Sequence, residues 1–171
     1  MPDLPVSTGT DANCFIYALE RAGSDRGRFI LGQLFDGNHR VIASTMALSE
    51  FLVSPYRQGT AAEVAAVRAG FQSLPGLELL PLTNEIADQA ARIRAATNLQ
   101  LPDAIHIATA LVAGAEAFLT NDRQLLRALD ELPILILEDV VGTRPASQPP
   151  SEFALSANPE ALAAPLKLDQ A

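Results

Sequence analysis

The chain has few of the residues on which several common protein functions depend. It contains one cysteine, Cys14, so an intramolecular disulfide and a zinc site built from cysteine ligands are both excluded. It contains one lysine, Lys167, which lies near the C-terminus, and it has no glycine-rich phosphate loop ending in Gly-Lys. Phosphotransferases and receiver-type domains generally need a lysine beside the phosphoryl group, so this class of function ranks low.

Long apolar runs are also missing. No stretch approaches the roughly 18 to 20 unbroken apolar residues that a membrane-spanning helix needs. The N-terminal segment MPDLPVSTGTDAN lacks the basic segment followed by an apolar block that marks a signal peptide. We therefore expect a cytoplasmic protein with no membrane association.

Basic residues are outnumbered, since 12 arginines and lysines face 20 acidic residues and the net charge is −8. Taken alone, this balance argues against tight, non-specific binding to nucleic acid, which depends on a basic surface. A group of carboxylates that holds one or two divalent cations is locally much less negative than the formula suggests. An acidic surface can also complement a basic protein partner, so the charge alone excludes neither kind of partner.

The 171 residues, 49% of them hydrophobic, are sufficient for one domain with a well-filled core. Short apolar strands alternate with helices across residues 1–141. This pattern predicts an α/β domain in which helices cover both faces of a mostly parallel sheet. Residues 142–171 are rich in proline and alanine and carry five of the twelve prolines. We interpret them as a tail outside the domain.

The expected elements follow from apolar runs, capping residues and proline positions. Strands are expected at residues 6–10, 40–43, 77–80, 117–119 and 134–137. Helices are expected at residues 14–20, 26–35, 46–53, 61–73, 84–96, 102–113 and 123–129. Thr45 and Thr83 are expected to cap the third and fifth of these helices, and Pro55 to interrupt the third. The first strand is the weakest, because serine, threonine and glycine dilute its apolar character.

Four acidic residues lie where an acid is locally out of place. Asp11 follows the extended stretch VSTGT, and Asp122 ends the run AFLTND at the close of a short strand. Glu50 lies inside the apolar run TMALSEFLV, and Asp103 begins the apolar helix DAIHIATALVAGA. An isolated buried carboxylate is costly, so such groups are usually paired or bound to a metal ion. The four acids therefore suggest one shared cation site.

The expected fold can bring these acids together. In open parallel sheets, ligands bind beyond the carboxyl ends of the strands, where the strand order reverses, and Asp11 and Asp122 both occupy strand ends. Asp103 at a helix start and Glu50 in a short helix can face the same crevice. Oxygen ligands without a histidine or cysteine framework select Mg²⁺ or Mn²⁺ over zinc. Such clusters commonly serve phosphodiester hydrolysis, in which cations activate water and neutralise charge on the phosphate.

A purely structural role stays open for two of the acids. Asp103 and Asp122 can each be a favourable first-turn charge at a helix N-terminus. Glu50 fits that explanation poorly because apolar residues flank it, and Asp11 fits it poorly because a strand end gives it no obvious duty.

The four acids stand in segments that resemble the PIN domain, a fold of metal-dependent ribonucleases. Within that family they look most like the toxin halves of bacterial VapBC-type toxin–antitoxin pairs. The matching segments are TDANCFIY, STMALSEFL, LPDAIHIATALVAGA and FLTNDRQL, in the family's order and across residues 10–137. The last two are the most specific, because an aspartate before an apolar, alanine-rich helix and then a strand ending in Thr-Asn-Asp form a joint pattern that is rare by chance. The first strand, PVSTGT, is less apolar than is usual in the family.

The resemblance implies a three-layer α/β/α sandwich with a mostly parallel central sheet. It also implies a catalytic, metal-binding cluster formed by Asp11, Glu50, Asp103 and Asp122. Asp11 and Asp103 are expected to be direct ligands of Mg²⁺ or Mn²⁺. Asn13 is expected to orient Asp11 or a water on the metal, and Thr120 to contact a ligand or to buttress Asp122.

Two further residues are weighed as weak substrate contacts. His106 lies three residues after Asp103 and shares its helix face, so it can hydrogen-bond a carboxylate or contact RNA. The favoured interpretation is a satisfied, partly buried histidine, since nothing else in the sequence pairs with it. Arg123 follows Asp122 and can touch a phosphate, with a surface salt bridge as the alternative.

The leading interpretation is a divalent-metal-dependent endoribonuclease that hydrolyses RNA phosphodiester bonds, as the toxin component of a type II toxin–antitoxin pair. Its expected partners are RNA, a small antitoxin protein that blocks the acidic site, and a second copy of the chain in a homodimer. The first alternative is a non-catalytic PIN-fold binding module, which the net charge of −8 favours slightly. A phosphotransferase or receiver-type domain ranks lower.

Overall fold

The computed structural model describes residues 5–20, 32, 34–127 and 132–142. Most of the helix expected at residues 26–35 lies outside these ranges. The tail expected at residues 142–171 also lies outside them, apart from its first residue. The division of the chain into a domain and a tail therefore stays a prediction.

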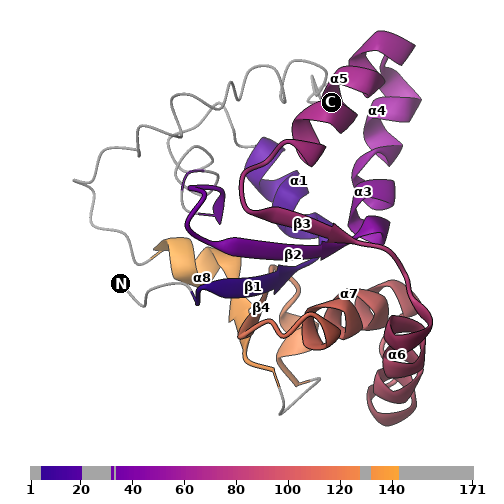
Figure 1. The fold of residues 1–171 in the computed structure, drawn as a ribbon, viewed down its shortest axis with the longest axis vertical. Helices are drawn as coiled ribbons and strands as arrows, with labels where there is room; N and C mark the ends of the chain where they lie inside the picture. The colour runs from indigo at the N-terminus through magenta and orange to yellow at the C-terminus, as the bar shows by residue number, and fades with distance from the viewer. Residues whose placement is uncertain (1–4, 21–31, 33, 128–131, 143–171) are drawn as a thin grey trace.

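Within the described ranges the strands form one five-stranded sheet, and every pair of neighbouring strands is parallel. The strands are β1 (Ser7–Thr10), β2 (Arg40–Ser44), β3 (Leu77–Leu80), β4 (Ala117–Thr120) and β5 (Ile134–Ile136). Their order across the sheet is β3-β2-β1-β4-β5. The strand order reverses at the central β1, because β2 and β3 lie on one side of it and β4 and β5 on the other (Figure 1).

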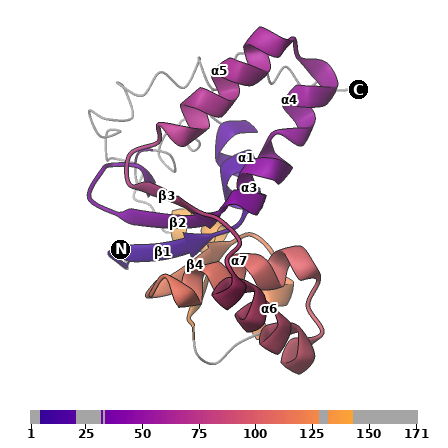
Figure 2. The ribbon, with the colours of Figure 1, turned by 45° about the vertical axis from the view of Figure 1, so that its right-hand side comes forward.

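Helices connect the strands and lie on both faces of the sheet (Figure 2). The described helices are α1 (Ala12–Glu20), α3 (Thr45–Phe51), α4 (Val53–Gln58), α5 (Ala61–Gln72), α6 (Asn84–Thr97), α7 (Leu101–Val112), the 3₁₀ helix η1 (Arg123–Arg127) and α8 (Leu137–Gly142). None of these helices is both long and apolar enough to cross a membrane.

Two separate cores show that the sheet is covered on both faces. In the first core, the ring centroid of Phe71 from α5 lies 4.6 Å from that of Phe15 in α1 and 4.8 Å from that of Phe51 in α3. Helices α6 and α7 build the second core. Successive strand residues point to opposite faces, and in β4 Phe118 joins the second core while Leu119 joins the first. The expected three-layer α/β/α sandwich with a parallel sheet is thus confirmed.

The central strand β1 has the least apolar sequence of the five strands. Thr8 and Thr10 are buried in it, so their hydroxyl groups need hydrogen-bond partners. The Thr8 hydroxyl donates to the carbonyl of Pro5 at 3.3 Å, and the Thr10 hydroxyl donates to the carbonyl of Leu119 at 3.1 Å. These bonds allow polar side chains to occupy the middle of the sheet.

The N-terminus of α3 differs from the prediction. Ser44, and not Thr45, is the cap, because its side-chain oxygen accepts from the backbone N–H of Met46 at 3.2 Å. β2 runs through Ser44, one residue further than expected, and this gives Ser44 the extended backbone that an N-cap residue needs. Pro55 does not interrupt this helix: α3 ends at Phe51, and Pro55 lies in the first turn of α4, where a missing N–H is tolerated.

The last strand also ends earlier than expected. Leu137 begins α8, which the sequence pattern did not predict, and β5 stops at Ile136. The backbone N–H of Glu138 donates to the side-chain oxygen of Asn121 at 3.2 Å, which ties the start of α8 to the end of β4. The cap of α6 is as predicted, with the Thr83 side chain accepting from the N–H of Ile86 at 3.2 Å.

Helix α7 packs very closely against β1 at Gly9. A methyl group on Gly9 would lie 2.3 Å from Cβ of Ala110 in α7 and 3.0 Å from Cδ2 of Phe118 in β4. Carbon atoms do not approach that closely in a packed core, so a larger residue would push α7 away from the sheet. Gly9 therefore sets the position of the helix that begins near Asp103.

We expect Gly9→Ala to lower the free energy of unfolding by roughly 1 to 3 kcal/mol, because overpacking forces the backbone to shift. Urea unfolding of the purified chain measures this loss. Ser7→Ala is the matched control in the same strand, since it removes a hydroxyl oxygen that is buried without a hydrogen-bond partner among the described residues. It should be neutral or slightly stabilising. Equal stability of Gly9→Ala and the wild type would contradict the tight contact.

Candidate functional site

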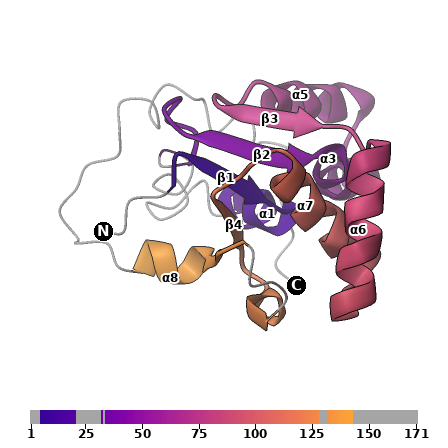
Figure 3. The same ribbon diagram turned by 60° about the horizontal axis from the view of Figure 1, so that its bottom comes forward.

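The carboxyl ends of β1, β2 and β4 lead to three of the four acids that the sequence singles out, and α7 carries the fourth. Figure 3 shows the carboxyl ends of β1 and β2 pointing toward α3 and α7. Asp11 directly follows β1, and Asp122 follows β4 after one intervening residue. Glu50 is carried by α3, which begins where β2 ends, and Asp103 lies in the first turn of α7. Asp11, Glu50 and Asp122 therefore follow strand ends near the point where strand order reverses. Asp103 is related to them through their charges, which raise its pKa.

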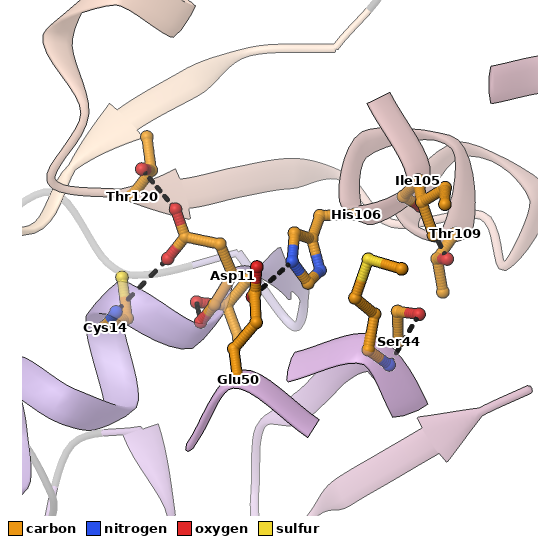
Figure 4. Close-up of polar contacts among 10 residues, drawn as sticks. Asp11, Cys14, Ser44, Glu50, Ile105, His106, Thr109 and Thr120 are labelled. Carbon is orange, nitrogen blue, oxygen red and sulfur yellow. Dashed lines mark hydrogen bonds and ion pairs between the residues drawn. The ribbon is translucent and has the colours of Figure 1, made fainter. Parts of the chain in front are cut away.

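Asp11 is a buried carboxylate held on both of its oxygen atoms (Figure 4). Oδ1 accepts from the backbone N–H of Cys14 at 3.2 Å, and Oδ2 accepts from the hydroxyl of Thr120 at 2.6 Å. Burial raises the pKa of Asp11, and the hydrogen bonds from Thr120 and Cys14 partly oppose that rise. The carboxylate is therefore fixed in orientation but remains costly to keep charged.

Thr120 joins the ends of two neighbouring strands. Its hydroxyl group donates to Asp11 and also accepts from the backbone N–H of Asp122 at 2.9 Å. The Thr120 side chain is fully buried, so neither contact is replaced easily by water. The expectation that Thr120 buttresses Asp122 fits this geometry, although the sequence did not reveal its direct bond to Asp11.

Asp122 itself has a structural contact. Its Oδ1 atom accepts from the backbone N–H of Gln124 at 2.8 Å, so it caps the start of η1. This agrees with the structural alternative for Asp122 and uses one of its two carboxylate oxygens.

Asp103 experiences the other acids as like charges. Burial is the largest cause that raises the pKa of Asp103, and the charge of Asp122 is the next. His106 acts in the opposite direction, while Asp11 and Glu50 raise the pKa further. The charges of the other three acids thus all disfavour ionisation of Asp103. Their assembly into one cation site stays a prediction.

Glu50 in α3 contacts His106 in α7. Nε2 of His106 lies 3.0 Å from Oε2 of Glu50. His106 is almost fully buried, whereas the Glu50 side chain is 40% exposed. His106 is buried, as the favoured interpretation holds. The premise that nothing else pairs with it is wrong, because the hydrogen bond to a carboxylate that the sequence left open is present. The partner lies 56 residues away in the chain, which is why no local pattern revealed it.

Two other residues take less part in this cluster. Arg123 forms an exposed ion pair with Asp139, with Nη2 lying 2.6 Å from Oδ1, as the surface-salt-bridge alternative predicts. Asn13 is exposed in the first turn of α1, and no hydrogen bond from it to Asp11 is found among the described residues.

The donor atoms fit a hard divalent cation in their chemistry. They are all carboxylate oxygens, which suit Mg²⁺ or Mn²⁺, and a cation would turn the repulsion at Asp103 into attraction. Within the described ranges, however, no three His, Cys, Asp or Glu side chains are already gathered closely enough to hold a metal ion. Side-chain movement would be needed to complete a coordination sphere.

The fold and this acidic group define an α/β protein with a carboxylate cluster at the carboxyl edge of a parallel sheet. The sequence model of the PIN domain matches residues 10–132, and the chain belongs to the PIN domain family. No protein with a curated description matches the chain in sequence.

Solved structures with this fold include toxin–antitoxin complexes. VapBC2 from Rickettsia felis, bound to a DNA fragment from its promoter, is 16% identical, with a TM-score of 0.62 over 76% of this chain and 98% of that chain. DNA-bound VapBC from Salmonella typhimurium is 18% identical, with a TM-score of 0.59 over 78% of this chain and 98% of that chain. A toxin–antitoxin complex from Klebsiella pneumoniae is 17% identical, with a TM-score of 0.54 over 75% of this chain and 95% of that chain. At these identities the similarity shows the shared fold.

We expect Thr120→Val to lower the free energy of unfolding by roughly 1 to 3 kcal/mol, because Asp11 and the N–H of Asp122 each lose a buried partner. Thr120→Ser keeps the hydroxyl group and serves as the control, with a much smaller loss. Urea unfolding in EDTA measures both variants. Valine keeps the methyl group of threonine and serine keeps its hydroxyl group, so a Thr120→Val variant as stable as the wild type would contradict the role of the hydroxyl bonds.

The stability of Asp103→Asn distinguishes a repelled carboxylate from a simple first-turn charge. A carboxyl group whose folded-state pKa is raised above 3.8 holds its proton longer in the folded chain than in the unfolded one. The wild type therefore loses stability as the pH rises from about 3.8 through the raised pKa, and the asparagine variant does not. We expect Asp103→Asn to be more stable at neutral pH by roughly 0.5 kcal/mol, with the difference vanishing near pH 4.

Thermal unfolding in EDTA across this pH range measures the difference. Glu85→Gln is the control, because Glu85 is an exposed first-turn acid of α6 and should cost a few tenths of a kcal/mol through the helix dipole. If Asp103→Asn is destabilised at neutral pH as this control is, Asp103 acts only as a first-turn charge.

Proposed function

We propose that the chain is a divalent-metal-dependent endoribonuclease that hydrolyses RNA phosphodiester bonds. The observation that carries this proposal is the buried Asp11 carboxylate, which is held on both oxygens at the carboxyl end of the central strand. The charges of Asp11, Glu50 and Asp122 also add to burial in raising the pKa of Asp103. Like charges that raise a pKa in this way reduce stability unless a cation compensates them. Perturbed carboxyl groups at the switch point of a parallel sheet are typical of a functional site.

In this proposal Asp11, Glu50, Asp103 and Asp122 hold Mg²⁺ or Mn²⁺, with Asp11 and Asp103 as direct ligands. The bound ion would supply water activation and neutralise charge on the phosphate. Hydrogen bonds from Thr120 and from the backbone N–H of Cys14 hold the Asp11 carboxylate in a fixed orientation. In this proposal Asn13, which is exposed two residues after Asp11, orients Asp11 or a water molecule on the metal. Arg123 contributes less, since Asp139 already engages it.

The proposed biological role is that of the toxin in a type II toxin–antitoxin pair. It rests on membership of the PIN domain family and on the toxin–antitoxin complexes among the similar structures. A small antitoxin would block the acidic site, and an arginine inserted among the carboxylates would bind there through charge-assisted hydrogen bonds. A homodimer is also proposed. A short open reading frame beside the gene would be the observation that identifies the antitoxin.

A non-catalytic PIN-fold binding module is the second candidate. It is favoured by the absence, among the described residues, of three side chains already gathered around a metal position. It predicts that Mn²⁺ leaves the melting temperature of the chain unchanged. The nuclease predicts stabilisation, by roughly 2.7 kcal/mol at a Mn²⁺ concentration 100 times the dissociation constant.

The direct test is cleavage of RNA by the purified chain in Mg²⁺ or Mn²⁺. We expect Asp11→Asn and Asp103→Asn to reduce the rate by about 100-fold or more, since each removes a proposed metal ligand. Glu85→Gln, an exposed acid outside the cluster, is the control and should cleave as the wild type does. Cleavage that persists in EDTA, or in both asparagine variants, would exclude the proposed mechanism.

A further inference from the structure

His106 is a buried residue whose described hydrogen bonding is directed at one acid of the site. It lies on α7 with a side-chain exposure of 2%, and its Nε2 atom lies 3.0 Å from Oε2 of Glu50. Its other ring nitrogen, Nδ1, is buried and has no hydrogen-bond partner among the described residues. A histidine kept only for packing needs no such arrangement, because an apolar side chain would leave no buried nitrogen unpaired.

The pairing determines where the imidazole proton resides. A proton on Nδ1 would leave a buried donor without an acceptor, while a proton on Nε2 is donated to the Glu50 carboxylate. The favourable neutral tautomer therefore carries its proton on Nε2. In that form the buried ring of His106 offers Glu50 a hydrogen-bond donor (Figure 4).

Glu50 is the acid that most needs such support. Its side chain is long and 40% exposed, so an unrestrained glutamate would sample several rotamers. By contrast, Asp11 is short, buried and held on both oxygens. His106 engages only Oε2 of Glu50, and Oε1 has no hydrogen-bond partner among the described residues.

We propose that His106 is a positioning residue, which fixes Glu50 through Oε2 so that Oε1 is presented to the cation shared with Asp11 and Asp103. This inference rests on the proposed metal-dependent function. α7 then serves the site twice on one helix face, because Asp103 and His106 are three residues apart. In this proposal Asp103 binds the cation directly, and His106 acts through Glu50 on α3.

The test compares two substitutions of matched size and flexibility. His106→Gln keeps an N–H donor at the reach of Nε2, whereas His106→Met has a similar length and no donor. Isothermal titration of the full chain with MnCl₂ measures the dissociation constant for Mn²⁺. We expect His106→Met to weaken binding by roughly 10- to 100-fold and His106→Gln to stay within about twofold of the wild type. Should His106→Met fail to fold, His106→Asn replaces it, since its shorter amide does not reach Glu50.

A double-mutant cycle shows whether His106 acts through Glu50. In a Glu50→Gln background, His106→Met should change the Mn²⁺ dissociation constant by no more than about twofold. Melting temperatures in EDTA report any purely structural cost separately. Equal binding by His106→Met and the wild type, equal losses in the methionine and glutamine variants, or full additivity with Glu50→Gln would each overturn the positioning role. If the wild type binds no Mn²⁺, both the metal-dependent function and the positioning role are refuted. If the wild type binds Mn²⁺ and His106→Met binds it equally well, only the positioning role is refuted.

Discussion

The hydrogen bond from the Thr120 hydroxyl to Asp11 is the contact around which the candidate site is arranged. It joins the ends of β1 and β4, which are neighbours at the point where the strand order reverses. The same hydroxyl accepts from the backbone of Asp122, so one buried side chain relates two of the four acids. Without this bond, the burial that raises the pKa of Asp11 would be opposed mainly by the N–H of Cys14. The position and the charge of Asp11 therefore depend on the same contact.

The second half of the site depends on how closely α7 approaches the sheet. The absence of a side chain at Gly9 lets Ala110 of α7 reach β1. That contact brings the first turns of α7 toward the carboxyl ends of the strands, with Asp103 among the acids and His106 against Glu50. A packing constraint in the middle of the domain thus determines which side chains meet at its edge.

The site shows a conflict between stability and chemistry. Asp103 is held near three like charges and partly out of water, an arrangement that folding alone does not favour. Proteins tolerate such local conflicts chiefly at functional sites, where another partner compensates them. His106 supplies part of the compensation at Glu50, and in the proposed function a divalent cation supplies the rest.

The sequence by itself determined the alternation of strands and helices and the capping of α6 by Thr83, because these depend on local patterns of a few residues. Its grouping of the four acids into one metal site stays a prediction. The sequence misplaced the cap of α3 at Thr45, since Ser44 and Thr45 are both good caps and only the length of β2 decides between them. It also missed α8, whose start is tied to Asn121, and the pairing of His106 with Glu50. These features were decided by the tertiary structure, because they join residues that are distant in the chain and come into contact only when the helices pack on the twisted sheet.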